Sequence, residues 1–142
     1  MPNVKRMIYI LAMILLFPNS SQSMPQSDSQ IEAENVIKIY HLATTQGDTA
    51  TIRSLLGGDL LKKRSTLLDN PTYPQHLISV YGGSTIEIMK NIIGNNGSIT
   101  IEAKILLKTG EVQQRSYLLK ENTDPRSQFR YSIVSDTSAN LD

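Results

Sequence analysis

The sequence contains no cysteine, no tryptophan and only two histidines among its 142 residues. Without cysteine the chain can form no disulfide and can carry no lipid on a cysteine at a cleavage site, so its folding must depend on packing. A metal site is not indicated either, because the two histidines are far apart and the carboxylates are scattered along the chain. We therefore expect no metal and no other cofactor.

An excess of charge of one sign is also absent. Lysine and arginine number 14, and aspartate and glutamate number 13. Nucleic acids and anionic membranes attract clustered positive charge, so a near-neutral chain predicts no nucleic-acid partner. The one basic cluster, residues 62–64, is interpreted as the solvated face of a helix.

No hydrophobic run is long enough to cross a bilayer as a straight helix. The run from Met7 to Phe17 is about half of the ~20 residues that a span needs. It follows a short basic region and ends at Pro18, the order typical of a secretory signal peptide. Because Ser21 and Ser23 are small, we expect cleavage after Ser23 and a periplasmic or secreted protein. The alternative is an uncleaved anchor in the inner membrane, and only then do we expect contact with a membrane.

The residues that follow predict a short leader and then three helices. Residues 24–29 are rich in Ser, Gln and Pro and are interpreted as disordered. Apolar residues at helical spacing predict a helix over 30–46, with Ser29 and Glu32 as its capping box and Gly47 closing it. Ile31, Ile39 and Leu42 are expected to widen its apolar face. Asp48 is a suitable cap for a second helix over 49–56, and a third ends before Pro71. The segment 75–81 is compatible with a helical turn or with an irregular approach to a sheet.

From residue 84 the hydrophobic period changes from helical to two, which predicts four consecutive strands separated by turn signals. In the first strand Ile86, Ile88 and Ile92 share one face. The second strand, over 98–108, is the clearest, and its inward side chains are Ile99, Ile101, Ala103, Ile105 and Leu107. The last strand is expected over 129–134. The domain therefore covers 30–136, and residues 137–142 are expected to form a frayed tail.

The register between strands two and three depends on the turn that joins them. If Thr109 and Gly110 form a two-residue turn, Gln114 and Ser116 face inward with strand two. Leu106, Tyr117 and Leu119 then form an apolar patch on the outer face, which we interpret as a candidate interface. This register places Lys104 opposite Arg115, a like-charge pair. Either Glu102 screens the pair diagonally, or a bulge shifts the register after Glu111.

Helices followed by an antiparallel meander predict an α+β fold, with N-terminal helices packed on the concave face of a curved four-stranded antiparallel sheet. Three segments resemble the nuclear transport factor 2-like superfamily. They are residues 34–51, with Val-Ile-Lys-Ile-Tyr and Gln-Gly-Asp-Thr; 108–111, Lys-Thr-Gly-Glu; and 129–134, Phe-Arg-Tyr-Ser-Ile-Val. They are most similar to small exported bacterial domains whose function is not established, although Phe129 stands where such domains often have Trp. The resemblance implies a cone-shaped roll with a pocket between helices and sheet, and some members of the superfamily are isomerases or dehydratases.

The candidate pocket residues are Tyr40, Ile101, Ile105, Gln114 and Ser116, among which we expect no catalytic residue. Tyr40 lies on the apolar stripe of the first helix. His41 is interpreted as a solvated or capping side chain at the edge of this stripe, and His76 as a surface residue. The inward face of the central strands offers no acid or base, so proton abstraction would lack a base. The sequence also lacks a Gly-x-Ser-x-Gly elbow and a glycine-rich phosphate loop.

These observations predict an exported, non-enzymatic domain that binds a small apolar ligand or a protein partner of the cell envelope. One alternative is an isomerase or dehydratase that uses Tyr40 with an acid not identified in the sequence. Another is a structural subunit that forms a homodimer through Leu106, Tyr117 and Leu119.

Overall fold

The computed structural model describes residues 25–139, which form an α+β domain with four helices and four strands. The α+β class, with helices before a four-stranded antiparallel sheet, is as predicted. The helices are α2 (Asp28–Gln46), α3 (Thr49–Leu55), α4 (Gly58–Leu68) and α5 (Tyr73–Tyr81). The strands are β1 (Thr85–Ile93), β2 (Ile99–Leu106), β3 (Val112–Glu121) and β4 (Tyr131–Ser138). The predicted signal peptide, residues 1–23, lies outside the described residues.

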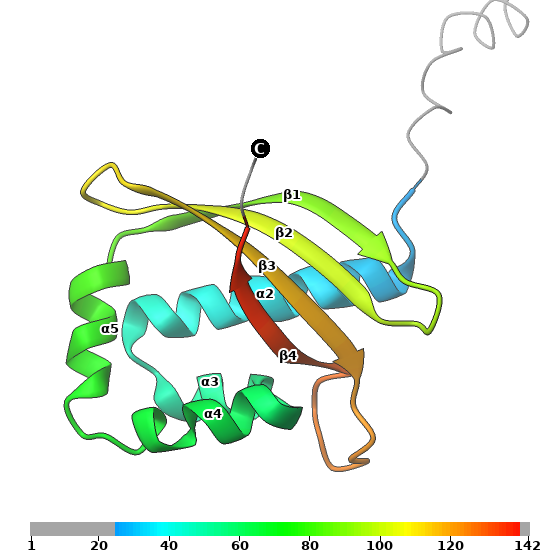
Figure 1. Ribbon diagram of the computed structural model, residues 1–142, viewed down its shortest axis with the longest axis horizontal. Coiled ribbons are helices and arrows are strands. Elements are labelled where there is room, and N and C mark those ends of the chain that lie inside the picture. The colour runs from blue at the N-terminus through cyan, green and yellow to red at the C-terminus, as the bar shows by residue number, and fades with distance from the viewer. Residues whose placement is uncertain (1–24, 140–142) are drawn as a thin grey trace, which may run out of the picture.

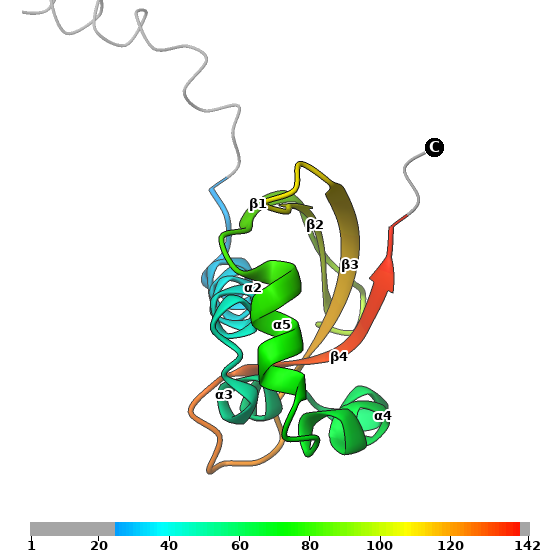
Figure 2. The ribbon, with the colours of Figure 1, turned by 90° about the vertical axis from the view of Figure 1, so that its left-hand side faces the viewer.

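The strands form one antiparallel sheet in the order β1-β2-β3-β4, which is curled but not closed. Helix α2 lies along the concave face of this sheet, and α5, α3 and α4 gather at one end of the molecule (Figure 1). A view from that end shows α5 in front of α2, with the sheet curving around them (Figure 2).

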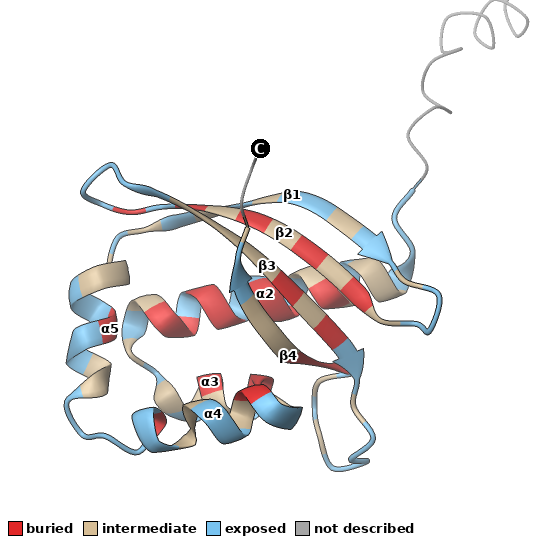
Figure 3. Cartoon of the chain, in the orientation of Figure 1, coloured by how far each residue is buried: buried red, intermediate tan, exposed pale blue. Residues whose placement is uncertain are grey.

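Helix α2 buries one face against the sheet, as its 3.6-residue periodicity predicts (Figure 3). The predicted stripe is confirmed: its buried side chains include Ala33, Val36, Ile37, Tyr40 and Ala43. The expectation that three further apolar residues widen this face is wrong. Ile31, Ile39 and Leu42 are exposed, because they project away from the sheet.

The capping residues of α2 differ from the predicted ones at its start and agree at its end. The helix begins two residues early, and its capping box is formed by Ser27 and Gln30 rather than by Ser29 and Glu32. At the other end Gly47 adopts the left-handed conformation, with φ 65°. Asp48 then caps α3 by accepting a hydrogen bond from the backbone N–H of Thr51 at 3.1 Å.

The segment left open by the sequence is helix α5. Pro74 lies in its first turn, where the missing N–H of proline costs no helical hydrogen bond. Helix α5 packs on α2 close to Gly47, where a Cβ atom would lie 2.6 Å from the carbonyl oxygen of Pro74. Gly47 thus permits both the end of α2 and the close approach of α5.

A bulge at Met89 reverses the alternation of β1. The pairing of β1 with β2 shifts between Ile88 and Lys90, so Asn91 pairs with Ile101 and faces α2. The side-chain amide of Asn91 donates to the backbone carbonyl of Gln30 at 3.0 Å. The prediction that Ile92 shares a face with Ile86 and Ile88 is therefore wrong, and the Ile92 side chain is exposed.

The connection between β2 and β3 has three residues, Lys108 to Gly110, rather than two. The Leu107 N–H donates to the carbonyl of Glu111 at 2.9 Å, and Gly110 has φ 92°. This geometry is typical of a three-residue hairpin with a left-handed third residue. The predicted register is consequently wrong by one residue, and Ala103 pairs with Arg115. Of the two alternatives for the pair Lys104 and Arg115, the structure contains the shifted register. The longer turn causes this shift, and not a bulge after Glu111.

The core lies between α2, α3 and the concave face of the sheet. Its fully buried large side chains are Ile37, Leu55, Ile99, Ile101, Leu119 and Ile133. Strand β4 extends to Ser138, so Thr137 and Ser138 belong to the sheet and not to a frayed tail. Across residues 25–139, no helix has the length and apolar character needed to cross a membrane.

Candidate functional site

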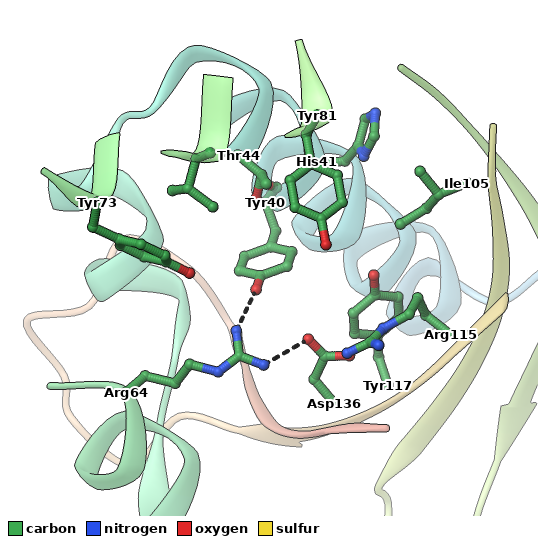
Figure 4. Close-up of a pocket in the computed structure, with 11 residues that line it drawn as sticks. Tyr40, His41, Thr44, Arg64, Tyr73, Tyr81, Ile105, Arg115, Tyr117 and Asp136 are labelled. Carbon is green, nitrogen blue, oxygen red and sulfur yellow. Dashed lines mark hydrogen bonds and ion pairs between the residues drawn. The ribbon is translucent and has the colours of Figure 1, made fainter. Parts of the chain in front are cut away.

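A polar cavity of about 70 Å³ lies where α2, α4 and α5 meet the concave face of the sheet (Figure 4). Its lining combines charged side chains and tyrosines with few apolar groups. The lining residues are Tyr40, His41, Thr44, Arg64, Tyr73, Leu77, Tyr81, Ile105, Arg115, Tyr117 and Asp136. Three helices and three strands thus contribute to a single site.

Helical spacing explains which residues of the helices reach the cavity. Tyr73, Leu77 and Tyr81 are four residues apart, so they form one stripe along α5 that faces α2 and the sheet. Tyr40 and Thr44 are likewise one turn apart on α2. The side chain of Arg64 extends from α4 into the cavity (Figure 4). The prediction that the basic cluster 62–64 is only a solvated face is therefore wrong for Arg64.

A second bulge turns Asp136 toward the cavity. Leu119 pairs with Ile133, but Leu118 pairs with Ser135, so Val134 is an extra residue in β4. Strict alternation from Ile133 would place Ser135 on the inner face, and the bulge places Asp136 there instead, opposite Tyr117. The side chain of Asp136 is only 5% exposed.

Asp136 joins two arginines from different elements. One of its carboxylate oxygens, Oδ2, accepts a hydrogen bond from Arg64 Nη2 at 3.1 Å. The other, Oδ1, accepts from Arg115 Nε at 2.9 Å and from Arg115 Nη2 at 2.5 Å. Both carboxylate oxygens are therefore occupied, and the cluster holds two guanidinium groups for one carboxylate.

The buried tyrosines of the cavity are proton donors at neutral pH. Burial, with the nearby charge of Asp136, raises the pKa of Tyr40 to about 12. The Tyr40 hydroxyl accepts a hydrogen bond from Arg64 Nη1 at 3.1 Å. Burial and the same carboxylate also raise the pKa of Tyr117, whose ring meets that of Tyr40 edge to face, with centroids 6.1 Å apart.

Two tyrosine hydroxyls face the cavity with no hydrogen-bond partner among residues 25–139. They belong to Tyr73 and Tyr117, whereas the Tyr81 hydroxyl donates to Gln113 Oε1 at 3.4 Å. Figure 4 shows Tyr73, Tyr81 and Tyr117 pointing toward the space beside Arg64 and Asp136. The cavity therefore contains donors that a bound molecule can use.

His41 is a buried neutral side chain rather than the solvated one that the sequence predicts. Its Nε2 lies 3.3 Å from both the backbone carbonyl oxygen and the hydroxyl of Ser84. The carbonyl accepts a hydrogen bond from a protonated Nε2, and the hydroxyl can donate one to an unprotonated Nε2. Burial lowers the pKa of His41 below its usual value, although the Ser84 hydrogen bond opposes the change. His76, by contrast, is exposed on α5, as predicted.

The structure brings together only part of the predicted pocket. Tyr40 and Ile105 line the cavity. Ile101 is fully buried in the core, and Gln114 and Ser116 lie on the opposite face of the sheet, because the three-residue turn shifts β3 by one position. The same shift places Arg115 on the inner face.

The predicted interface patch is not a continuous outer surface. Tyr117 and Leu119 face inward and are 2% and 0% exposed, whereas Leu106 faces outward and is 47% exposed. A Leu119→Glu substitution would thus place a charge in the core and unfold the domain, so it could not test whether the protein forms a dimer through this patch. Leu106 pairs with Val112, which is also exposed.

Sequence reasoning missed Arg64, Arg115 and Asp136. No acid faces inward from the central strands β2 and β3, but the edge strand β4 supplies an inward carboxylate, Asp136, which the prediction did not consider. One signal was present: the predicted register opposed Lys104 to Arg115, and a shift by one residue removes this repulsion. In the structure Lys104 pairs with Gln114. Nothing in the local sequence indicates the bulge at Val134 that turns Asp136 inward.

Comparisons with known proteins identify no relative: no family model, curated protein or solved structure matches the chain. In the part of the chain that the structure describes, no group of three or more His, Cys, Asp or Glu side chains could hold a metal ion. The fold and the cavity define this protein as an α+β domain with a curled four-stranded antiparallel sheet and a polar cavity between the sheet and its helices.

Proposed function

We propose that this chain is an exported binding domain that holds a small polar molecule in the cavity around Arg64, Asp136 and Arg115. One observation carries the proposal: Asp136 joins Arg64 from α4 to Arg115 from β3, beside two tyrosine hydroxyls that have no partner among residues 25–139. Buried arginines are costly unless their N–H groups are paired. A site that keeps two of them beside open space is suited to a ligand with hydrogen-bond acceptors.

The same contacts favour binding over proton abstraction. A general base needs a lone pair within reach of the substrate, and both oxygens of Asp136 already accept hydrogen bonds from guanidinium groups. His41 Nε2 is engaged with the carbonyl and hydroxyl of Ser84, and Tyr40 stays protonated because burial raises its pKa to about 12. Asp136 is therefore held by guanidinium groups and Tyr40 is protonated at neutral pH, while His41 keeps one ring lone pair but is a weak base, because burial lowers its pKa.

The composition of the cavity changes the expected ligand from apolar to polar. Leu77 and Ile105 are the aliphatic side chains of its lining, whereas Arg64, Arg115 and Asp136 are charged. An apolar ligand would displace water from these charged groups and return no hydrogen bond, which is unfavourable. A molecule with oxygen acceptors displaces the same water but accepts hydrogen bonds from the charged groups in its place.

Export is supported by the sequence order of residues 1–23, a basic region, an apolar run and small residues. The resemblance to exported domains of the nuclear transport factor 2-like superfamily supports the same assignment. Mass spectrometry of the protein recovered from the periplasm or medium of a bacterial expression host is expected to show a chain that begins at Met24. Recovery of the full-length chain in the membrane fraction would contradict export with cleavage and would favour the anchor.

The binding proposal is tested by titrating the protein with a set of small acids, amides, alcohols and hydrocarbons while recording backbone amide resonances. We expect a polar subset to shift resonances of Thr44, Arg64 and Tyr117, and hydrocarbons to shift none. Arg64→Gln should weaken the response, because it removes a charged donor. Arg126→Gln is the matched control, since this arginine lies on an exposed loop with its side chain 90% exposed. Shifts confined to residues outside the cavity, or an unchanged response in Arg64→Gln, would contradict the proposal.

A further inference from the structure

We infer that the ligand of this cavity is a small monocarboxylate, whose carboxylate group is bound beside Arg64 and Arg115 and receives a hydrogen bond from Tyr117. This inference rests on the proposed binding function and specifies the chemical class of the ligand. Three independent properties of the cavity support it: its charge, its hydrogen-bonding groups and its size.

The charge of the lining is one unit positive. Arg64 and Arg115 contribute two positive charges, and Asp136 is the one carboxylate among the lining residues. His41 adds no charge at neutral pH, because burial lowers its pKa. Uncompensated charge in a partly buried site is unfavourable, so a ligand with a single negative charge balances the cluster. A doubly charged anion would instead leave an excess negative charge beside Asp136.

The hydrogen-bonding groups of the lining also require acceptors from the ligand. Each guanidinium has five N–H donors. Arg64 uses two of them, one to Asp136 and one to the Tyr40 hydroxyl, and Arg115 uses three, two to Asp136 and one to the Ser138 hydroxyl, so N–H groups remain on both. Tyr73 and Tyr117 add hydroxyls that no residue of 25–139 hydrogen-bonds, and Tyr117 stays protonated because its pKa is raised by burial. Asp136 is the one carboxylate of the lining, and its oxygens already accept three hydrogen bonds from the two guanidinium groups. A carboxylate, which only accepts and matches the planar guanidinium, is the complementary group.

The size of the cavity limits the rest of the molecule. Its volume of about 70 Å³ is well below the ~300 Å³ at which pockets begin to hold drug-sized ligands. The ligand therefore has only a few heavy atoms inside the cavity. Leu77 and Ile105 provide an apolar part of the lining for a short alkyl group. Propionate has this combination of one negative charge, two acceptor oxygens and a short alkyl chain.

The inference is tested by isothermal titration of the whole protein with propionate, propionamide and sulfate at constant ionic strength. Propionamide has nearly the shape of propionate but no charge, and sulfate carries two charges. We expect propionate to bind at least tenfold more tightly than propionamide, because loss of a charged hydrogen-bond partner is typically worth about tenfold or more. It should also bind more tightly than sulfate, whose second charge leaves an excess of negative charge beside Asp136. Equal or tighter binding of propionamide or sulfate would overturn the monocarboxylate assignment and leave the binding function standing.

A variant tests the position of the bound carboxylate. Tyr117→Phe removes one hydroxyl and keeps the ring that packs on Tyr40, so the variant should fold. Tyr131→Phe is the matched control, because Tyr131 is equally buried but does not line the cavity. We expect Tyr117→Phe to weaken propionate binding by about tenfold to a hundredfold, and Tyr131→Phe to leave it unchanged. Equal affinities of the two variants would overturn the inference. If no compound of any class shifts the cavity resonances, the proposed binding function itself fails.

Discussion

Replacing Asp136 by Asn tests whether the buried carboxylate holds the cavity together. The substitution keeps the shape of the side chain but removes its charge, leaving Arg64 and Arg115 close to each other without a counter-charge. Removal of one partner from a buried ion pair typically costs about 3–5 kcal/mol. Because each arginine side chain is about a quarter exposed, at 25% and 24%, solvent screens part of the loss. We expect a loss of about 3 kcal/mol of unfolding free energy, at the lower end of this range.

Urea denaturation followed by circular dichroism measures this loss. If the slope of the unfolding free energy against urea concentration is the same in the variant and the parent protein, the substitution has changed stability alone. Asp124→Asn is the control, because Asp124 pairs with Arg126 on an exposed loop and should cost less than about 1 kcal/mol. The double variant with Arg115→Gln should lose less than the sum of the single losses, since the two side chains share one interaction. A loss below about 1 kcal/mol for Asp136→Asn would refute the assignment of a structural role to this carboxylate.

Three further outcomes are expected. Burial raises the pKa of Tyr40 in the folded state to about 12, from 10.0 for an exposed tyrosine, so the folded state retains a proton that the unfolded chain releases. Stability should therefore fall by about 2 kcal/mol as pH rises from 10 to 12. Tyr40→Phe should reduce this loss in alkaline urea titrations, and an unchanged loss would contradict the raised pKa. The pKa of His41 is lowered in the folded state, so stability should decrease as pH falls below the usual histidine value of ~6.5. His41→Gln should flatten this part of the pH profile, and a profile identical to that of the parent protein would refute the assignment. Gly47→Ala should cost more than Gly97→Ala: both positions have positive φ, worth about 1–2 kcal/mol, but only at Gly47 does a Cβ atom meet backbone, at 2.6 Å from Pro74 O. Equal thermal stabilities of these two alanine variants would show that α5 does not pack closely against Gly47.

The elements of this fold can be predicted from the sequence because each depends on local pattern. The stripe from Ala33 to Ala43 predicts α2, Asp48 marks the start of α3, and the change to a period of two marks the sheet. The order of helices before a four-stranded antiparallel meander follows from these signals. Local propensity and alternation determine the type of each element, and the structure confirms the types.

The faces of the strands could not be predicted, because three irregularities determine them. The extra residue in the turn before β3 exchanges its two faces, and bulges at Met89 and Val134 exchange parts of β1 and β4. A shift of one residue moves every following side chain to the other face of the sheet. The cavity depends on two of these irregularities, since they turn Arg115 and Asp136 inward. Bulges are positioned by tertiary packing, which the local sequence does not reveal.

The bond between Arg64 and Asp136 also has a consequence for how the protein matures. The two residues are 72 positions apart in the chain, and Asp136 lies near the end of the last strand. Contacts this distant in sequence form only after the intervening loop has closed, at an entropic cost. The cavity is therefore completed only when the C-terminal strand has joined the sheet. A molecule that binds there binds the finished domain and not its folding intermediates, so it stabilises the native state by mass action.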